Sequence, residues 1–294
     1  MTAAGVTPDT DVIGKRSEHL YFALRNPKVV IGLAIVVGLL LLGVIGPFFL
    51  DGNPNAYVGP KSEAPSGEYW LGTTYFGQDV FSQFVHGLRS SYVVGGLGGL
   101  LAFVIGLTVG FTAGYRGGLV DEFLNMLTNV VLVLPALAVL IVISSYLESR
   151  GVISQAVIIG LFSWPWVARA VRAQTFTLRN RDYVDLAKLT GKRAPQIIIR
   201  EIMPNMASYL LMSLILLFGG AILFAAMLDF IGLGPSDAVS LGTMMQQSMA
   251  WSALHLKLWW WFVPPGLAIT AIVGSLYITN VGLDEVFNPK LREM

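Results

Sequence analysis

Long runs of apolar residues without a charged side chain alternate with shorter polar segments along this chain. Six of these runs reach or approach the roughly 18 to 20 residues with which a helix crosses about 30 Å of hydrocarbon. Backbone amides in lipid must find hydrogen-bond partners within their own segment, so runs of this length predict membrane-spanning helices. The six predicted spans are residues 29–50, 90–115, 123–147, 151–168, 206–228 and 258–283.

Composition supports the same prediction. Hydrophobic residues make up 54% of the 294 residues and charged residues only 13%, whereas soluble domains contain about 45 to 50% apolar residues. The mean hydropathy is +0.67. The absence of cysteine excludes disulfides and thiolate metal ligands, and we expect no metal site and no nucleic-acid partner. We therefore predict an all-α polytopic membrane protein, a bundle of six helices that contacts the lipid bilayer directly.

Basic residues are distributed unevenly over the segments that connect the spans, and this sets the predicted orientation. Of the 19 lysines and arginines, 15 fall into segments 1–28, 116–122, 169–205 and 284–294. Because cytoplasmic segments carry the excess of positive charge, both termini are predicted to lie in the cytoplasm, with the spans in the cell (inner or plasma) membrane. The longer segments 51–89 and 229–257 are then predicted to be extracytoplasmic.

Segment 180–205, NRDYVDLAKLTGKRAPQIIIREIMPN, is polar although it lies between two predicted spans. A charged side chain at the bilayer centre costs about 2.5 to 3.5 kcal/mol on insertion scales, so this segment cannot cross the membrane. Asn180 is placed to cap the start of a short helix, and Gly191 to follow its end. Pro195 can then open a second short helix that leads to the fifth span.

Two interpretations of this helix pair follow from its residues. An amphipathic connector could lie on the membrane surface and bind anionic headgroups through its basic side chains. Alternatively, the first helix could dock onto a cytosolic partner. Tyr183, Leu186, Ala187 and Thr190 recur at helical spacing and form a face of apolar and small residues. The docking interpretation is favoured because we expect Asp185 and Ala187, rather than a purely basic stripe, on the exposed face.

The order of residues in this segment resembles the EAA loop of ABC-transporter permeases. Asp185-Leu186-Ala187, then Gly191, then Met203-Pro204 follow the spacing of that motif. Asp185 and Met203 are conservative departures from the family pattern, whereas Leu186 and Glu201 replace smaller, apolar or histidine residues. The resemblance implies that Tyr183, Asp185, Leu186, Ala187, Gly191 and Pro204 form a coupling segment that contacts a cytosolic ATPase.

Three further stretches are similar to the C-type permease subunit of dipeptide and oligopeptide importers, whose relatives also carry nickel or oligosaccharides. LGTTYFGQD at 71–79 resembles LGTDxxGRD, with Thr74 and Gln78 in place of Asp and Arg, and FIGLG at 230–234 resembles FLGLG. PGLAI at 265–269 and the ending NPKLR resemble the last span and tail. The extracytoplasmic residues that carry this resemblance are Gly72, Thr73, Gly77, Asp79, Arg89, Gly232 and Gly234.

The resemblance implies the type I ABC importer permease fold and a set of partners. These are a homologous second permease subunit in a heterodimer, two cytosolic ATPase subunits or one fused pair, and an extracytoplasmic substrate-binding protein. ATP and magnesium would be bound by the ATPase chains, and no cofactor is expected in this chain, which has no GxxxxGK[ST] phosphate loop. The solute implied is a peptide, with an oligosaccharide or a nickel chelate as alternatives.

These inferences divide the chain into a cytoplasmic segment 1–28, a first span 29–50, an extracytoplasmic loop 51–89, a permease core 90–283 and a cytoplasmic tail 284–294. The core contains the coupling segment 180–205 and the extracytoplasmic loop 229–257. Gly106, Gly110 and Gly114 form tandem GxxxG steps that predict close helix packing. Four prolines could permit kinks or pivots: Pro135, Pro165, Pro264 and Pro265. Trp259, Trp260 and Trp261 are interpreted as an interfacial aromatic belt.

Other functional classes fit the residues less well. An intramembrane enzyme would need catalytic groups close together, but His19, His86 and His255 are scattered and Asp229 stands alone at the end of a predicted span. A secondary transporter typically carries ionisable residues inside its helices, and the six predicted spans contain none. A structural membrane scaffold stays open as a third alternative.

Overall fold

The computed structural model describes residues 22–50, 52–147 and 150–287, and within these ranges the fold is built from helices without a strand. Four helices are long and apolar enough to cross a membrane, α2 (Pro27–Ile45), α3 (Val80–Arg116), α11 (Ala207–Leu228) and α13 (Trp259–Phe287). Two bent pairs can each supply one more span. The predicted all-α bundle with six spans agrees with this architecture.

Each bent pair breaks at a proline named in the sequence analysis. α4 (Gly118–Val133) and α5 (Ala136–Tyr146) meet at 81°, with Pro135 in extended conformation before α5. α6 (Val152–Ser163) and α7 (Pro165–Leu178) meet at 42°, and Pro165 is the first residue of α7. A proline at these positions removes a helical hydrogen bond and clashes with the preceding turn. By contrast, α13 continues through Pro264 and Pro265 as one helix.

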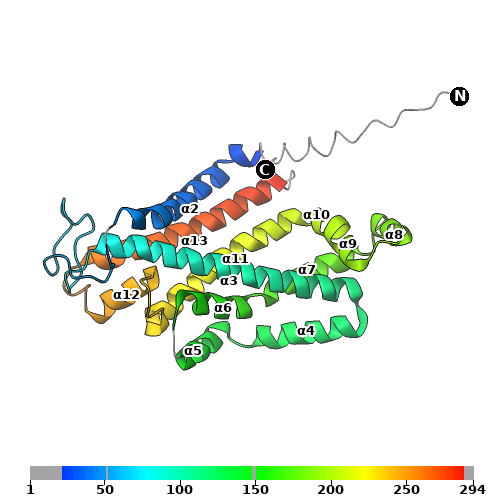
Figure 1. Ribbon diagram of the computed structural model, residues 1–294. Helices are drawn as coiled ribbons and strands as arrows, with labels where there is room; N and C mark the ends of the chain where they lie inside the picture. Colours follow the sequence, from blue (N-terminus) through cyan, green and yellow to red (C-terminus); the bar gives the residue numbers. More distant parts are fainter. Residues whose placement is uncertain (1–21, 51, 148–149, 288–294) are drawn as a thin grey trace.

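The central helix is α3, which packs against α2, α6, α7 and α11, while α2 and α13 lie side by side on one flank of the bundle (Figure 1). Three clusters of buried apolar residues fill the space around α3. One of them joins α3 and α7 to the short helices α8 (Asp182–Leu189) and α9 (Ala194–Ile197). These short helices lie at the opposite end of the molecule from α12 (Leu241–Ala250) and the segment 52–79 (Figure 1).

Several helices are longer than the predicted spans. The second predicted span starts at residue 90, but α3 starts at Val80, where the Asp79 side chain accepts a hydrogen bond from the backbone N–H of Phe81 (3.0 Å). Arg89 therefore lies in α3 and not in a loop. Likewise α7 continues to Leu178. The helices thus extend beyond the predicted spans and contain charged residues. A charge-free run predicts only the part of a helix that can lie in lipid, not the whole helix.

The three consecutive tryptophans do not form the aromatic belt that the sequence analysis predicts. Trp261 is completely buried, and Trp260 is almost completely buried with its Nε1 donating to the carbonyl oxygen of Thr73 (3.1 Å). Of the three, Trp259 is exposed. Trp260 and Trp261 therefore join α13 to the segment before α3, since their apolar rings pack inside the fold while one N–H finds a protein acceptor.

Candidate functional site

The short helix α8 (Asp182–Leu189) is defined most sharply at its C-terminal end. The backbone N–H of Lys192 donates to the carbonyl oxygen of Ala187 (3.3 Å), and that of Gly191 donates to Lys188 (3.0 Å). Gly191 has a φ of +75°. This pair of bonds is a Schellman motif, in which glycine supplies the left-handed residue that other amino acids adopt at a cost. Gly191 therefore occupies the position that the spacing predicts.

The start of α8 differs from the prediction. Its N-cap residue is Arg181, whose side chain makes no capping bond, while the predicted cap, Asn180, donates from its side chain to Phe176 (3.4 Å) at the end of α7. The prediction was wrong by one residue because α7 continues almost to the start of α8. Only a short turn, 179–181, separates the two helices. A displacement of α8 would therefore reach α7 directly.

The faces of α8 also differ from the prediction. Val184 and Ala187 are buried, with Ala187 only 5% exposed, whereas Leu186 is 63% and Leu189 is 85% exposed. Ala187 was expected on the exposed face, but it packs toward the cluster of α3, α7 and the later part of the segment. Leu186 and Ala187 were also expected to share one face, but one is exposed and the other is buried. The spacing alone does not say which side of the helix meets the rest of the protein. Tyr183 lies between these two faces, partly buried.

The remainder of the segment folds back onto α8. Pro195 lies in the first turn of α9, a π-helical turn follows at Ile198–Ile202, and Pro204 lies in the short helix α10 (Met203–Asn205). Glu201 forms an ion pair with Lys192 (2.6 Å), which joins the turn after α8 to the π-helical turn. Glu201, which departs from the family motif, thus has a local role, because its ion pair holds the π-helical turn against the turn after α8.

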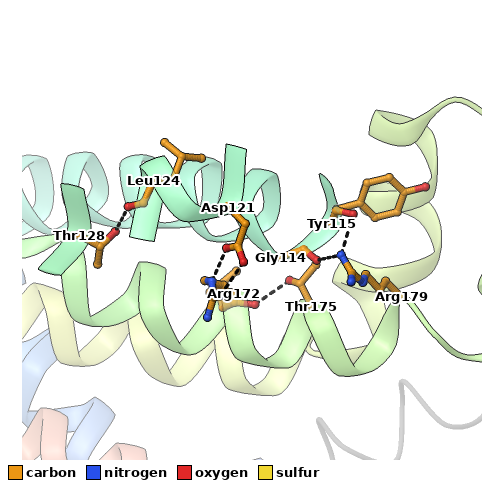
Figure 2. A network of polar contacts seen from close by, with 9 residues as sticks. Gly114, Tyr115, Asp121, Leu124, Thr128, Arg172, Thr175 and Arg179 are labelled. Atoms are coloured by element: carbon orange, nitrogen blue, oxygen red, sulfur yellow. Dashed lines mark hydrogen bonds and ion pairs between the residues drawn. The ribbon is translucent and has the colours of Figure 1, made fainter. Parts of the chain in front are cut away.

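Arg172 of α7 and Arg179, which directly follows α7, hold the turn between α3 and α4 (Figure 2). Arg172 donates twice to the carboxylate of Asp121 in the first turn of α4, with an Nη2–Oδ2 distance of 2.6 Å. Arg179 donates to the carbonyl oxygens of Gly114 (3.1 Å) and Tyr115 (3.3 Å) at the end of α3. We call these contacts the arginine clamp. It connects α3, α4 and α7 immediately before α8.

The three glycines of the GxxxG steps, on successive turns of α3, all face α7. A Cβ atom at Gly106, Gly110 or Gly114 would lie 3.1, 2.7 or 2.7 Å from a carbonyl oxygen of α7. These oxygens belong to Trp164, which directly precedes α7, and to Ala168 and Arg172, with the same four-residue spacing. The two backbones are therefore in direct contact, as small residues permit in membrane helices.

At the other end of the molecule, the motif residues of segment 71–79 organise the entry into α3. Gly72 and Gly77 have φ values of +66° and +84°, and a Cβ at Gly72 would lie 2.5 Å from the carbonyl oxygen of Glu63. Thr73 donates to the carbonyl oxygen of Pro60 (2.6 Å). Burial raises the pKa of Asp79, although backbone N–H donors oppose this effect. These residues define a turn and a helix cap.

The two departures in this motif lie next to each other. Both side chains are buried, and the Thr74 hydroxyl lies 3.3 Å from Oε1 of Gln78, while the N–H of Gln78 donates to Thr74 Oγ1 (3.1 Å). The side chain of Gln83 donates to the same Oε1 (3.1 Å). A neutral pair therefore occupies the positions where the resembling family has Asp and Arg.

Asp229 is not isolated, in contrast to its interpretation from the sequence. It follows α11 and is buried, with Gln155 Nε2 of α6 donating to Oδ1 (2.5 Å) and the hydroxyl of Ser240 donating to Oδ2. Gly234 and Gly242 approach its side chain so closely that a Cβ would lie 2.8 and 2.5 Å from its atoms. Sequence reasoning missed this contact because the three polar residues lie far apart in the chain.

A polar cavity of about 480 Å³ opens beside this carboxylate. Arg150 and Gln246 contribute to its lining together with the turn that contains Gly232 and Gly234. Arg150 donates to the carbonyl oxygen of Gly232 (3.1 Å), where φ is +88°. The predicted site residues therefore divide into two groups at opposite ends of the bundle, segment 180–205 and the motifs around Gly72 and Gly232. The glycine contacts of α3 and α7 lie between them.

A helical multi-pass membrane protein with a short, capped helix pair between its fourth and fifth spans is the class that this fold defines. The family model described as "Binding-protein-dependent transport system inner membrane component" matches residues 106–293. The chain belongs to this family, and it is a permease subunit of an ABC importer.

Curated relatives match over nearly the whole chain. A Brucella suis protein named as a peptide permease is 30% identical over 91% of this chain and 88% of its own length. A Brucella abortus protein named as a peptide transport system permease is 33% identical over 92% and 90%. The oligopeptide transport system permease protein OppC of Bacillus subtilis is 28% identical over 99% and 96%.

Proposed function

We propose that this chain forms half of the pathway through which an ATP-driven importer moves peptides across the membrane. A homologous second permease subunit would supply the other half. The names of the relatives support a peptide as the solute, with an oligosaccharide or a nickel chelate as alternatives. A substrate-binding protein on the extracytoplasmic side would deliver the solute, in keeping with the description of the family.

The orientation belongs to the same proposal. Both termini and α8 face the cytoplasm, since the basic residues gather on that side. The segment 52–79 and α12 then face the binding protein. ATP and magnesium are bound by two ATPase subunits or one fused pair, and this chain is not catalytic. Closure of the ATPase dimer around ATP pushes on α8, and α7 carries that displacement into the membrane.

The observation that carries this proposal is the exposure of Leu186 and Leu189 on a firmly terminated helix. Large apolar side chains that are 63% and 85% exposed are candidates for burial against a partner. The same helix is anchored to its own chain by Val184 and Ala187. A helix that binds a partner through one face and is packed against its own chain on the other can pass on a displacement, because it moves together with the residues it packs against.

The proposal predicts that Leu186→Ala and Leu189→Ala together weaken binding of the ATPase and reduce uptake about tenfold or more, since a few buried apolar anchors dominate most interfaces. The measurement is solute uptake by the complex reconstituted in vesicles, together with copurification of the ATPase. Leu24→Ala is the matched control, because Leu24 is 63% exposed and lies near the start of α2 on the same side. Its uptake should stay at the wild-type level.

Three outcomes would contradict the coupling role. Normal uptake and normal ATPase binding in the double variant would assign the two leucines to the membrane surface, as in an amphipathic connector. Uptake that persists without any ATPase would instead favour a secondary transporter. A complex that assembles normally but transports no solute in the wild type would favour the scaffold alternative.

A further inference from the structure

A row of polar side chains runs along the outer surface of the α4–α7 pair. Glu122 and Arg169 are exposed, and Asn125 and Asn129 are partly exposed. Residues of α4 line an open hollow of about 590 Å³, in which Glu122, Asn125 and Asn129 alternate with apolar side chains. Glu122 and Arg169 lie one residue outside the predicted spans 123–147 and 151–168, so the charge-free runs did not predict that these side chains form a row.

The end of the row formed by Asn129 and Arg169 lies at the level of a predicted span. A Cβ at Gly110 would lie 2.7 Å from the carbonyl oxygen of Ala168, so the next residue, Arg169, stands at the level of Gly110. Gly110 lies six residues before the end of α3 at Arg116, which is about 9 Å along a helix axis. It also lies within the charge-free run 90–115. A charged or amide side chain that faces lipid at this depth is costly, so ionisable residues within spans face the protein interior or water.

The chemistry of Arg169 distinguishes it from its neighbour on α7. The charge of Arg172 is neutralised by Asp121, as described for the arginine clamp. Arg169 instead donates from Nη2 to Oδ1 of Asn129 (2.7 Å). Its partner among the described residues is thus a neutral amide and not a carboxylate. A guanidinium has five N–H donors in a planar fork that matches a carboxylate. Asn129, which itself lines the open hollow, thus holds this fork next to the hollow.

We propose that Arg169, oriented by Asn129, binds the carboxylate of the transported solute within a water-filled pathway lined by the α4–α7 row. The inference rests on the proposed function, because it needs a solute that passes along this surface. It adds a site for an anionic group to a pathway whose predicted spans contain no ionisable residue. Since α7 leads into α8 after a short turn, Arg169 and the coupling helix would also move together.

The first test asks whether the row faces water, and it does not depend on the solute. The chain contains no cysteine, so Asn125→Cys introduces a unique thiol whose labelling can be read from the mass of this chain. In the assembled complex, a charged methanethiosulfonate reagent should label it. Leu41→Cys on the outer surface of α2 should react at least tenfold more slowly. Absence of labelling at residue 125 would overturn the proposal.

The second test asks whether Arg169 recognises a carboxylate. Uptake of trialanine and of trialanine amide is measured with the reconstituted complex, each relative to the wild type. Arg169→Gln should reduce trialanine uptake about tenfold or more, leave the amide unchanged and keep the stimulation of the ATPase by loaded binding protein. Arg169→Lys should retain part of the activity. Arg116→Gln, which removes an exposed arginine from the end of α3, is the matched control.

The outcomes separate the two proposals. Equal loss for trialanine and its amide, or loss of complex assembly, would assign Arg169 to subunit contacts and overturn the carboxylate site. No loss for either peptide would overturn it as well. If the wild-type complex transports neither peptide, the peptide assignment of the proposed function fails. In that case labelling at residue 125 decides whether the row faces water, and an unlabelled thiol still overturns the site.

Discussion

At the scale of single residues, the buried pair of Thr74 and Gln78 shows how two departures from a family motif can compensate each other. In the resembling family these positions carry Asp and Arg. Here a hydroxyl and an amide make the contact without charge. Removing one partner of a buried ion pair is strongly destabilising, so a chain that loses one charge is expected to lose the other.

This reasoning predicts a strongly non-additive pair of substitutions. Thr74→Asp alone buries a carboxylate and Gln78→Arg alone buries a cation, so each should lower stability by about 3 kcal/mol or more. The double variant should recover at least about 1 kcal/mol relative to the sum, because the two charges pair. Apparent Tm values in detergent measure the effect. Thr74→Asn combined with Gln78→Arg serves as the control, and equal Tm values for both doubles would refute the pairing.

Gly191 permits a second residue-scale prediction. Its Cβ would meet no atom within 4 Å, but its φ is +75°, so Gly191→Ala tests backbone conformation without a steric clash. We expect a loss of about 1 to 2 kcal/mol in the stability of the α8 turn. The turn should therefore open more often, which hydrogen exchange of the Lys192 amide can measure. Gly220→Ala is the control, since Gly220 also has free space but lies within α11. Equal exchange in both variants would contradict the Schellman assignment.

At the scale of elements, the sequence predicted helices well and their ends less well. Charge-free runs coincide with the four long apolar helices and the two bent pairs, because the requirement for internal hydrogen bonds in lipid leaves few alternatives. The helix α3 begins ten residues before the predicted span, since it continues through Arg89 to a cap at Asp79. Trp260 and Trp261 were assigned to an interface although both are buried. Residues distant in sequence bury these tryptophans, and a local sequence pattern does not predict such contacts.

The contact between α3 and α7 gives the prediction for this scale. A Cβ at Gly110 would lie 2.7 Å from both the carbonyl oxygen of Ala168 and the Cβ of Val171. Gly110→Ala must therefore push the helices apart, and we expect a loss of about 1 to 3 kcal/mol. Gly38→Ala in α2 is the control, because no atom lies within 4 Å of its Cβ. The apparent Tm in detergent measures both changes, and equal values would show that the helices yield without cost.

At the scale of the whole molecule, the sequence indicated which segment to consider as the candidate site, but not which of its side chains are exposed. The spacing of Asp185, Ala187 and Gly191 indicated the segment that we propose for coupling, whereas the burial of Ala187 and the exposure of Leu189 depend on how α8 packs. Asp229 and Arg169 were missed for the same reason, since their partners come from other helices. What connects the two ends of the protein is the chain of contacts from α8 through α7 to α3 and α4.

The arginine clamp is where this connection can be cut. Asp121→Asn removes the charge that holds Arg172, whose side chain is 31% exposed against 15% for Asp121. The double-mutant cycle with Arg172→Gln should yield a coupling energy of about 1 kcal/mol, which is at the upper end of the range for exposed pairs. Since α4 is then no longer held to α7, a movement of α7 should not move α4. We therefore expect fewer solute molecules to be moved per ATP hydrolysed, while the ATPase still binds.

The matched control is the ion pair between Lys28 and Glu285, which joins α2 to α13 outside the path from α8 to α4. Glu285→Gln weakens a charge contact of the same kind, so the ratio of solute moved to ATP hydrolysed should stay at the wild-type value even if the Tm falls. Both quantities are measured in the same vesicles. A clamp variant whose ratio is unchanged, or a control whose ratio falls equally, would show that motion of α8 reaches the pathway through the glycine contacts of α3 alone.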